Sequence, residues 1–394
     1  MFNRERDVYL DNAATTRVDP LVAKEVMAFF EKYYANPHGI HFASVVAEDA
    51  IEKAREKVAK VIEANPEDII FTSGGTESDN LAIIGTARAV KQKGTHIITT
   101  AIEHPAVTNT CKYLQVEMGF DVTYLPVDRT GRIDIEEFKK AIRNDTVLIT
   151  VMSANNEIGT IQPIKEIGEI ASDKGILFHT DAVQAYGKIP IDVNAMNIDL
   201  LSISGHKVHA PKGIGALYMK NGGKDKTGRN YLRPISFGGG QERGFRSGTA
   251  NVPGIVGLGK AAEIILNNPQ ELERERKLCE KIIQEVIRLG NSFINGHPIH
   301  KLPNIVNFGF RDLNGSTLLK ALSERYIFCS TGSACSAKTK DVSPVLSACG
   351  VSEPDIFGCL RWSLSRFTIE KDVDYALSQL KAITGDFRMR CKNA

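Results

Sequence analysis

The chain has 394 residues, of which 42% are hydrophobic and 24% charged, and its formal net charge is +2. This length exceeds the ~250–300 residues at which a single hydrophobic core stops growing, so we expect two domains. The balanced charge gives no general electrostatic reason to expect a nucleic acid or an anionic membrane as the main partner.

No segment approaches the ~20 consecutive apolar residues of a membrane-spanning helix. The first residues, MFNRERDVYLDNAA, carry charges and no apolar core, so we expect no secretory signal and a cytoplasmic location. An odd number of scattered cysteines without a Cys-x-x-Cys pair argues against a disulfide framework and a structural zinc site. These seven residues are Cys111, Cys279, Cys329, Cys335, Cys349, Cys359 and Cys391.

Strand-like and helix-like segments alternate along the chain. An amphipathic helix is predicted over residues 47–64, because apolar side chains recur on one face and Asn65-Pro66 ends the pattern. Helical stretches separate nearly all of the apolar runs that follow, which favours an α/β fold with a mostly parallel sheet covered on both faces. A charged helix around residues 269–290 is predicted to lead into a smaller C-terminal α+β domain. The predicted strands are residues 68–72, 96–100, 122–127, 147–152, 177–181, 200–204 and 215–219.

One of these strands runs into Ser204-Gly205-His206-Lys207. Buried strands of an α/β sheet present polar residues at their carboxyl ends. We therefore interpret Lys207 as the amine that reacts with the aldehyde of pyridoxal phosphate (PLP). Most lysines are solvated surface charges, so this interpretation depends on finding the rest of a cofactor site.

A Ser-Gly-Gly-Thr turn at residues 73–76 joins a predicted strand to a predicted helix. Its bare backbone amides and the Thr76 hydroxyl lie at a helix N-terminus, where a phosphate is readily held. The alternative is an ordinary glycine-rich turn with Thr76 as the helix N-cap. The turn matches neither G-x-G-x-x-G nor a Walker loop, so dinucleotide and nucleoside triphosphate sites are disfavoured.

Two further polar residues follow apolar strands. Asp181 ends the strand 177–181, and a carboxylate there is expensive to desolvate unless it meets a cation such as a pyridinium N–H. His104 follows the strand 96–100, where an imidazole can lie on a flat ring or exchange protons. In isolation, Asp181 could equally be a helix N-cap, and His104 a structural residue.

Together these residues favour a PLP site, because each set follows a separate predicted strand and ligands bind at that edge of an open sheet. A phosphate cradle, an acid for the ring nitrogen, a stacking histidine and an imine lysine are the contacts that PLP needs. The set comprises Gly74, Gly75, Thr76, His104, Asn156, Asp181, Gln184, Ser204, His206 and Lys207.

The same residues lie in motifs that span nearly the whole chain. These are YLDNAATT (9–16), NPHGIH (36–41), SGGTESDN (73–80), EHPAV (103–107), NNEIG (155–159), HTDAVQ (179–184), SGHK (204–207), RSGT (246–249), SACS (333–336) and LRWSLSRF (360–367). With them the sequence resembles the cysteine desulfurases of the NifS/IscS type, within the fold-type I PLP enzymes. The resemblance implies a large domain over residues 17–261 with a seven-stranded sheet, and a small domain formed by residues 1–16 and 262–394.

The resemblance also implies a role for each site residue. Lys207 is the Schiff-base lysine, His104 stacks on the cofactor ring, and Asp181 contacts the pyridine nitrogen. Gln184 contacts the phenolic oxygen. The phosphate is held by Gly75, Thr76, Ser204 and His206, and by Thr249 from the other subunit of a homodimer. The substrate carboxylate is held by Asn156 and Arg361.

The cysteines decide which reaction the cofactor serves. Cys335 lies among small polar residues with no apolar period, which predicts an exposed loop, and Lys338 and Lys340 nearby favour a lowered thiol pKa. The other six cysteines lie in helix-like or strand-like stretches and are predicted to be small core residues, with Cys329 as the nearest rival nucleophile. The family resemblance also points to Cys335 as the persulfide-forming residue.

We therefore expect conversion of L-cysteine to L-alanine, in which Lys207 removes the Cα proton and Cys335 takes the sulfur as a persulfide. Lys207 or His104 supplies the proton that completes alanine. The persulfide then passes to a sulfur-acceptor or iron-sulfur scaffold protein. Iron-sulfur cluster assembly and tRNA thiolation are both left open as the destination.

Two other functions fit parts of the pattern. Another fold-type I activity, such as an aminotransferase or a selenocysteine lyase, would use Lys207 and Asp181 but would not need Cys335 for sulfur transfer. A non-catalytic scaffold could keep the fold and hold an iron-sulfur assembly partner. No resident metal is expected, although Cys335 as a transient cluster ligand is left open.

Overall fold

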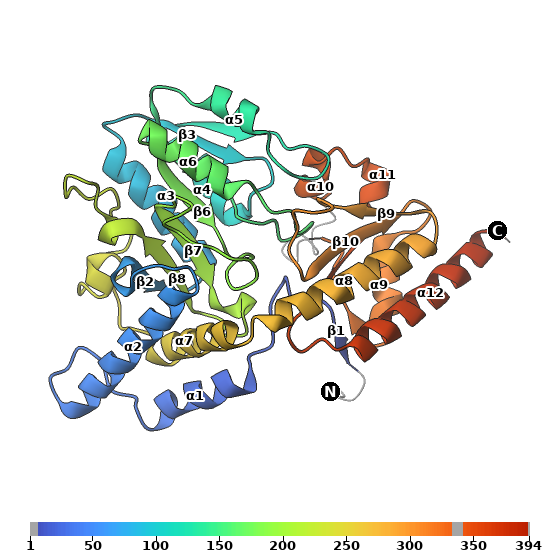
Figure 1. The fold of residues 1–394 in the computed structure, drawn as a ribbon, viewed down its shortest axis with the longest axis horizontal. Coiled ribbons are helices and arrows are strands. Elements are labelled where there is room, and N and C mark those ends of the chain that lie inside the picture. The colour runs from blue at the N-terminus through green and yellow to red at the C-terminus, as the bar shows by residue number, and fades with distance from the viewer. Residues whose placement is uncertain (1–6, 333–341, 393–394) are drawn as a thin grey trace.

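The computed structural model describes residues 7–332 and 342–392 (Figure 1). A seven-stranded sheet dominates the first two thirds of the chain, and its strand order is β2-β8-β7-β6-β5-β3-β4. The strands from β7 to β4 pair in parallel, whereas β8 runs antiparallel to both of its neighbours. In chain order the strands are β2 (Ile69–Thr72), β3 (His96–Thr100), β4 (Asp121–Leu125), β5 (Thr146–Thr150), β6 (Leu177–Asp181), β7 (Leu200–Ser204) and β8 (Gly215–Met219).

Helices cover both faces of this sheet, because its strands are apolar on both sides. Ile69 and Phe71 belong to one core cluster and Ile70 to another, as the alternating side-chain directions of a strand require. The mostly parallel, seven-stranded α/β sheet predicted from the sequence is confirmed. The helices that pack around it are α1 (Pro20–Glu31), α2 (Phe42–Lys60), α3 (Gly75–Val90), α4 (Pro105–Met118), α5 (Ile135–Ala141), α6 (Ile164–Lys174) and α7 (Val252–Asn267).

A smaller antiparallel sheet of order β12-β10-β9 forms the second part of the molecule, at the right of Figure 1. Its core is a separate cluster that includes Val306, Phe308 and Trp362. The strands are β9 (Ser292–Asn295), β10 (Ile305–Phe310) and β12 (Cys359–Ser363), and the helices are α8 (Gln270–Arg288), α9 (Gly315–Ser323), α10 (Pro344–Ala348), α11 (Glu353–Ile356) and α12 (Glu370–Lys392). The predicted domain limits at residues 16/17 and 261/262 stay predictions, and α7 continues to Asn267.

The N-terminal segment joins the two parts. Strand β1 (Val8–Tyr9) pairs in parallel with β11 (Ile327–Phe328), near the small sheet. The following residues return toward the large sheet, where Thr16 N–H donates to the His206 carbonyl at 2.9 Å. Among the described residues, no helix is long and apolar enough to cross a membrane.

Two helix boundaries differ from the sequence prediction. Helix α2 begins at Phe42 rather than at residue 47, because His41 caps it by accepting the Ser44 N–H. The sequence pattern does not reveal this start, because Phe42 and Val45 are apolar but exposed and do not continue the buried face of the later turns. The helix after β2 begins at Gly75, within the Ser-Gly-Gly-Thr segment predicted to be a turn, which brings Thr76 into its first turn.

Candidate active site

A cavity of about 690 Å³ opens at the carboxyl edge of the large sheet. Its walls come from the segments that follow β2, β3, β5, β6 and β7, together with β12 of the small sheet. Ten of the predicted site residues line it: Gly75, Thr76, His104, Asn156, Asp181, Gln184, Ser204, His206, Lys207 and Arg361. Thr249 is exposed and is not part of this lining, and Cys335 lies outside the described residues.

Lys207 belongs to the short 3-10 helix Gly205–Lys207 that follows β7. Its Nζ donates to the Ala13 carbonyl at 2.6 Å and to the Ala14 carbonyl at 2.8 Å. The N-terminal segment therefore forms a shelf of two carbonyl oxygens beneath the lysine amine. Backbone carbonyls favour the ammonium form of a lysine, so this shelf can stabilise a proton that Lys207 has taken up.

Asp181 is the last residue of β6 and is buried. Its Oδ1 accepts the Val183 N–H at 2.8 Å, which fixes the carboxyl at the cavity floor. Burial raises the pKa of Asp181, while the nearby His104 and Lys207 act in the opposite direction. A cationic ring nitrogen at this position would favour the carboxylate further.

His104 caps α4, because its Nδ1 accepts the Ala106 N–H at 3.1 Å. Burial lowers the pKa of His104, and the charge of Lys207 adds to this, although Asp181 opposes it. The imidazole is therefore held in one orientation, in its neutral form, with Nε2 carrying the proton. A neutral, fixed imidazole is suited both to stacking on a ring and to proton exchange.

The N-terminus of α3 forms the anion-binding end of the cavity. Gly74 has φ of +154°, and a Cβ on Gly75 would lie 2.6 Å from Val183 Cγ2, so glycine is required for this close approach. Thr76, in the first turn of this 16-residue helix, lines the same cavity as Ser204 and His206, and a Cβ on Gly75 would lie 3.5 Å from Ser204 Cβ. Helix N-terminal amides with nearby hydroxyl and imidazole groups fit a phosphate.

Arg361 reaches the cavity from β12 and is almost fully buried. Its Nη1 donates to the Asn156 carbonyl at 2.9 Å, and its Nη2 pairs with Asp11 at 2.7 Å. Its Nε has no hydrogen-bond partner in the described part of the chain. A buried guanidinium at the cavity wall fits the carboxylate of an amino acid, for which arginine provides paired donors.

Sequence reasoning missed two buried acids in the same cavity, Asp79 and Glu103. Asp79 Oδ1 has no hydrogen-bond partner among the described residues and lies 3.7 Å from His179 Nε2. Burial raises the pKa of Asp79 well above its usual value, and Asp181 adds to this. The pKa of His179 falls to about 3 through burial, so the imidazole beside Asp79 is neutral.

Glu103 accepts hydrogen bonds through Oε1 alone, from the Thr100 hydroxyl at 2.7 Å and the Met152 N–H at 3.0 Å. Its buried Oε2 has no partner in the described residues. Burial raises the pKa of Glu103 to about 8, so this carboxyl carries a proton at neutral pH. Both missed acids lie in motifs that the sequence highlights, SGGTESDN and EHPAV, but a motif does not reveal which side chains point inward.

None of the cysteines whose side chains the structure describes lines the active-site cavity. Cys329, the rival nucleophile, is half-buried beside β11, and burial raises its thiol pKa to about 12. The predicted core position is confirmed for Cys111, Cys279, Cys349 and Cys359, which are buried, and burial likewise raises their pKa values. A thiol with such a pKa is a poor nucleophile at neutral pH.

Comparison with known proteins gives the family. The class-V aminotransferase family model matches residues 8–376. The cysteine desulfurase IscS of Methanosarcina thermophila is 48% identical to this chain over 97% of this chain and 93% of that protein. A solved NifS-like protein superposes with a TM-score of 0.89 at 41% identity, covering 96% of this chain and 99% of that one. A structure of SspA in complex with cysteine has a TM-score of 0.80 at 41% identity, covering 92% of this chain and 99% of that one. The chain therefore belongs to the class-V aminotransferase family and, within it, to the cysteine desulfurases.

Proposed function

We propose that this PLP-dependent cysteine desulfurase moves the sulfur of L-cysteine onto Cys335 and releases L-alanine. The observation that carries the proposal is a single cavity that holds the Lys207 amine, the buried Asp181, the N-terminus of α3 and the Arg361 guanidinium. Two of these groups suit the cofactor ring and phosphate, one suits an imine, and one suits a substrate carboxylate. None of these four groups, taken alone, would identify a PLP-dependent enzyme.

The residues of the cavity fit PLP, which supplies an aldehyde for an amine and a ring that accepts electrons from Cα when it is bound. Asp181 would contact the ring nitrogen, Gln184 the phenolic oxygen and His104 the ring face. The phosphate would be held by Gly75, Thr76, Ser204 and His206, with Thr249 of the partner subunit.

Lys207 is proposed to move the proton. Its amine takes the proton from the substrate Cα, and the carbonyls of Ala13 and Ala14 stabilise the resulting ammonium group. Lys207 or His104 then delivers a proton to Cβ, and a second proton returns to Cα, so that the proton taken by Lys207 and the proton lost by the Cys335 thiol account for both new C–H bonds of alanine. Arg361 and Asn156 hold the substrate carboxylate, which keeps Cα within reach of the amine.

Cys335 is proposed to accept the sulfur. Its thiolate attacks the substrate sulfur, an S–S bond forms, and the Cβ–S bond breaks with its electron pair left on the carbon side. The balance is L-cysteine plus an enzyme thiol giving L-alanine plus an enzyme persulfide. We propose that an acceptor protein in the cytoplasm, such as an iron-sulfur scaffold, takes the sulfur of the persulfide. A second proposed destination of the sulfur is tRNA thiolation. Cys335 is also proposed as a transient ligand of a nascent cluster.

A second copy of this chain is the proposed partner for the exposed apolar surface of α1, α2 and their connection. Tyr34 and Phe42 are 78% and 83% exposed, respectively. Large apolar side chains that gather in one region mark an interaction surface. The exposed members of this α1–α2 surface are Leu21, Met27, Phe30, Tyr33, Tyr34, Ile40, Phe42 and Val45. A homodimer would also allow the exposed Thr249 to reach the other subunit.

Two substitutions separate the proposed roles of the catalytic residues. Lys207→Ala should abolish turnover and the visible absorbance of the lysine-linked cofactor, because it removes the amine. Cys335→Ala should keep that absorbance and lose sulfur transfer. Peptide mapping by mass spectrometry after addition of L-cysteine should place one added sulfur atom on the Cys335 peptide of the unmodified protein.

Other results would reject the proposal. Alanine production without sulfide or persulfide would indicate another fold-type I activity. A chain that binds no PLP would indicate a non-catalytic scaffold. Persulfide formation by Cys335→Ala at the original rate would show that a different residue is the nucleophile.

A further inference from the structure

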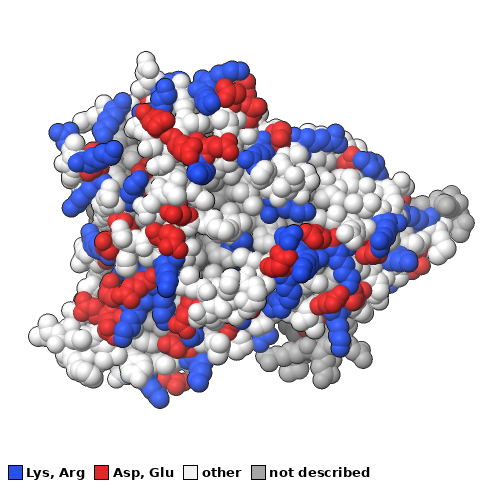
Figure 2. All heavy atoms as spheres, in the orientation of Figure 1, with Lys and Arg blue, Asp and Glu red and all other residues white. Residues whose placement is uncertain are grey.

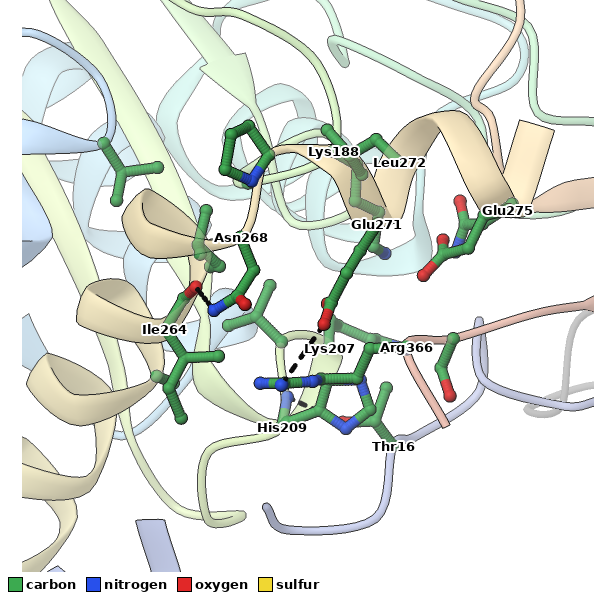
Figure 3. Close-up of a pocket in the computed structure, with 18 of the residues that line it drawn as sticks. Thr16, Lys188, Lys207, His209, Ile264, Asn268, Glu271, Leu272, Glu275 and Arg366 are labelled. Atoms are coloured by element: carbon green, nitrogen blue, oxygen red, sulfur yellow. Dashed lines mark hydrogen bonds and ion pairs between the residues drawn. The ribbon is translucent and has the colours of Figure 1, made fainter. Parts of the chain in front are cut away.

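A second cavity, of about 290 Å³, also has Lys207 in its wall. Figure 3 shows Lys188 and Glu275 on one side of this cavity and Lys207, His209 and Arg366 on the opposite side. Lys207 lines both cavities, so the two spaces adjoin at this residue.

Lys188 connects the second cavity to the active site through Gln184. It lies one turn after Gln184 in the segment that follows β6, and only 9% of its surface is exposed. Its Nζ donates to Gln184 Oε1 at 3.2 Å. On the other side of the same amide, Gln184 Nε2 donates to the Ala13 carbonyl at 2.9 Å. Lys188 thus contacts a cofactor-site residue from outside the active-site cavity.

These two contacts define the orientation of the Gln184 amide. A glutamine side chain has one oxygen that accepts and one nitrogen that donates twice. Lys188 occupies the oxygen, and Ala13 occupies one N–H. The second N–H of Nε2 is therefore left to donate to another group, and Gln184 lines the active-site cavity.

We propose that Lys188 is a positioning residue, which orients the Gln184 amide so that an N–H, rather than the oxygen, faces the phenolic oxygen of bound PLP. The inference rests on the proposed contact between Gln184 and the cofactor. Without a donor at Lys188, the buried Oε1 would lose its partner, and only the contact of Nε2 with the Ala13 carbonyl would oppose rotation of the oxygen toward another donor.

The surroundings of Lys188 are unfavourable for a purely structural lysine. Its charge faces Lys207, Glu275, His206 and His209. Burial, together with Lys207, lowers the pKa of Lys188 to about 7, and burial raises the pKa of Glu275 to about 7. Strongly shifted pKa values of this kind gather at functional sites.

The cofactor itself provides the readout. A hydrogen-bond donor at the phenolic oxygen stabilises its negative charge, which makes the neighbouring linkage nitrogen easier to deprotonate. Loss of that donor should raise the pKa of the linkage. We expect Lys188→Met to raise the linkage pKa by about one pH unit. A pH titration of the visible absorbance of the PLP-loaded enzyme measures this pKa.

A double-substitution cycle tests whether Lys188 acts through Gln184. Gln184→Leu should raise the linkage pKa by itself, and Lys188→Met should add no further shift in that background. An undiminished shift there would show that Lys188 acts through its own charge, and it would overturn the proposal. No shift in Lys188→Met alone would do the same.

Two matched variants control for folding and for changes in the second cavity. Lys188→Arg keeps a cationic donor, and the adjoining cavity has room for it, so it should titrate like the unmodified enzyme. Glu275→Gln alters the same cavity at a residue on α8 and should leave the linkage pKa unchanged. A shift in Glu275→Gln equal to that of Lys188→Met would indicate a general effect of the cavity and would overturn the proposal. Failure of the unmodified protein to bind PLP would instead reject the proposed function.

Discussion

Three buried carboxyl groups, those of Asp79, Glu103 and Asp181, surround one cavity. Burial raises the pKa of all three, and Asp181 adds to the rise for Asp79 and Glu103. Only Asp181 has His104 and Lys207 lowering its pKa. His104 and Lys207 therefore favour the carboxylate form at Asp181 over the other two acids, which suits the proposed contact of Asp181 with the ring nitrogen of PLP.

This distribution of charge predicts different results for two similar substitutions. Asp79→Asn replaces an acid whose protonated form is favoured by burial with an amide of the same shape, so the PLP dissociation constant should change by less than about threefold. Asp181→Asn removes the proposed charged partner of the ring nitrogen and should raise that constant by on the order of tenfold or more. Fluorescence titration of PLP into each protein measures both, and equal losses for the two variants would refute this division.

At this scale the sequence predicts residues that end strands better than residues on helices. Asp181 and Lys207 follow apolar runs, and the carboxyl edge of a parallel sheet brings such positions together. Asp79 was not predicted, because the rotation of α3 about its axis decides whether this side chain points into the cavity. The lysine shelf was not predicted either, since it uses backbone carbonyls of Ala13 and Ala14 that carry no side-chain signal.

Among the elements, β8 supports the turn before α3 that is proposed to bind the cofactor phosphate. It starts at the same edge where β2 and β7 end, because it runs antiparallel to both. A Cβ on its first residue, Gly215, would lie 2.6 Å from Gly74 Cα and 2.5 Å from the Ile203 carbonyl oxygen. The strand therefore packs directly against the backbone of the turn before α3. The sequence predicted this strand but not its direction, which depends on the short link from β7.

Gly215→Ala should therefore weaken the site through packing alone. Displacement of the Gly74 backbone should destabilise the protein by about 1–3 kcal/mol and weaken PLP binding, because the anion-binding amides move with it. Gly385→Ala is the control, since a Cβ there meets nothing within 4 Å. Thermal unfolding and PLP titration test both variants, and a Gly215→Ala protein with unchanged affinity would contradict the role given to β8.

On the scale of the whole molecule, charge is mixed and the apolar surface is local. Figure 2 shows lysine and arginine interspersed with aspartate and glutamate over the face in view, and an uncharged area at the lower left near α2. The α1–α2 surface contains Phe30, which is 61% exposed, and Tyr34. Composition alone predicted the balanced charge, but not where apolar side chains would gather, since that requires the packing of α1 and α2 against α7.

The proposed homodimer can be tested on that surface. The double substitution Phe30→Glu and Tyr34→Glu should shift the protein from dimer to monomer in light scattering, because it places charges within the buried contact. Val116→Glu adds a charge on α4, at a side chain that is 78% exposed outside the α1–α2 surface, and should leave the mass unchanged. A dimer that persists in the double variant would exclude this surface as the interface.

The shelf beneath Lys207 also has a consequence for the order of synthesis. The segment that provides it is anchored by residues made much later, because Asn12 Nδ2 donates to the Ser363 carbonyl at 2.8 Å across 351 positions of the chain. Asp11 likewise forms an ion pair with Arg361, which lies 350 positions later in the chain. Contacts this distant in sequence form late during folding. We therefore expect that the two carbonyls beneath Lys207 are held in place only after residues 361–363 have been synthesised.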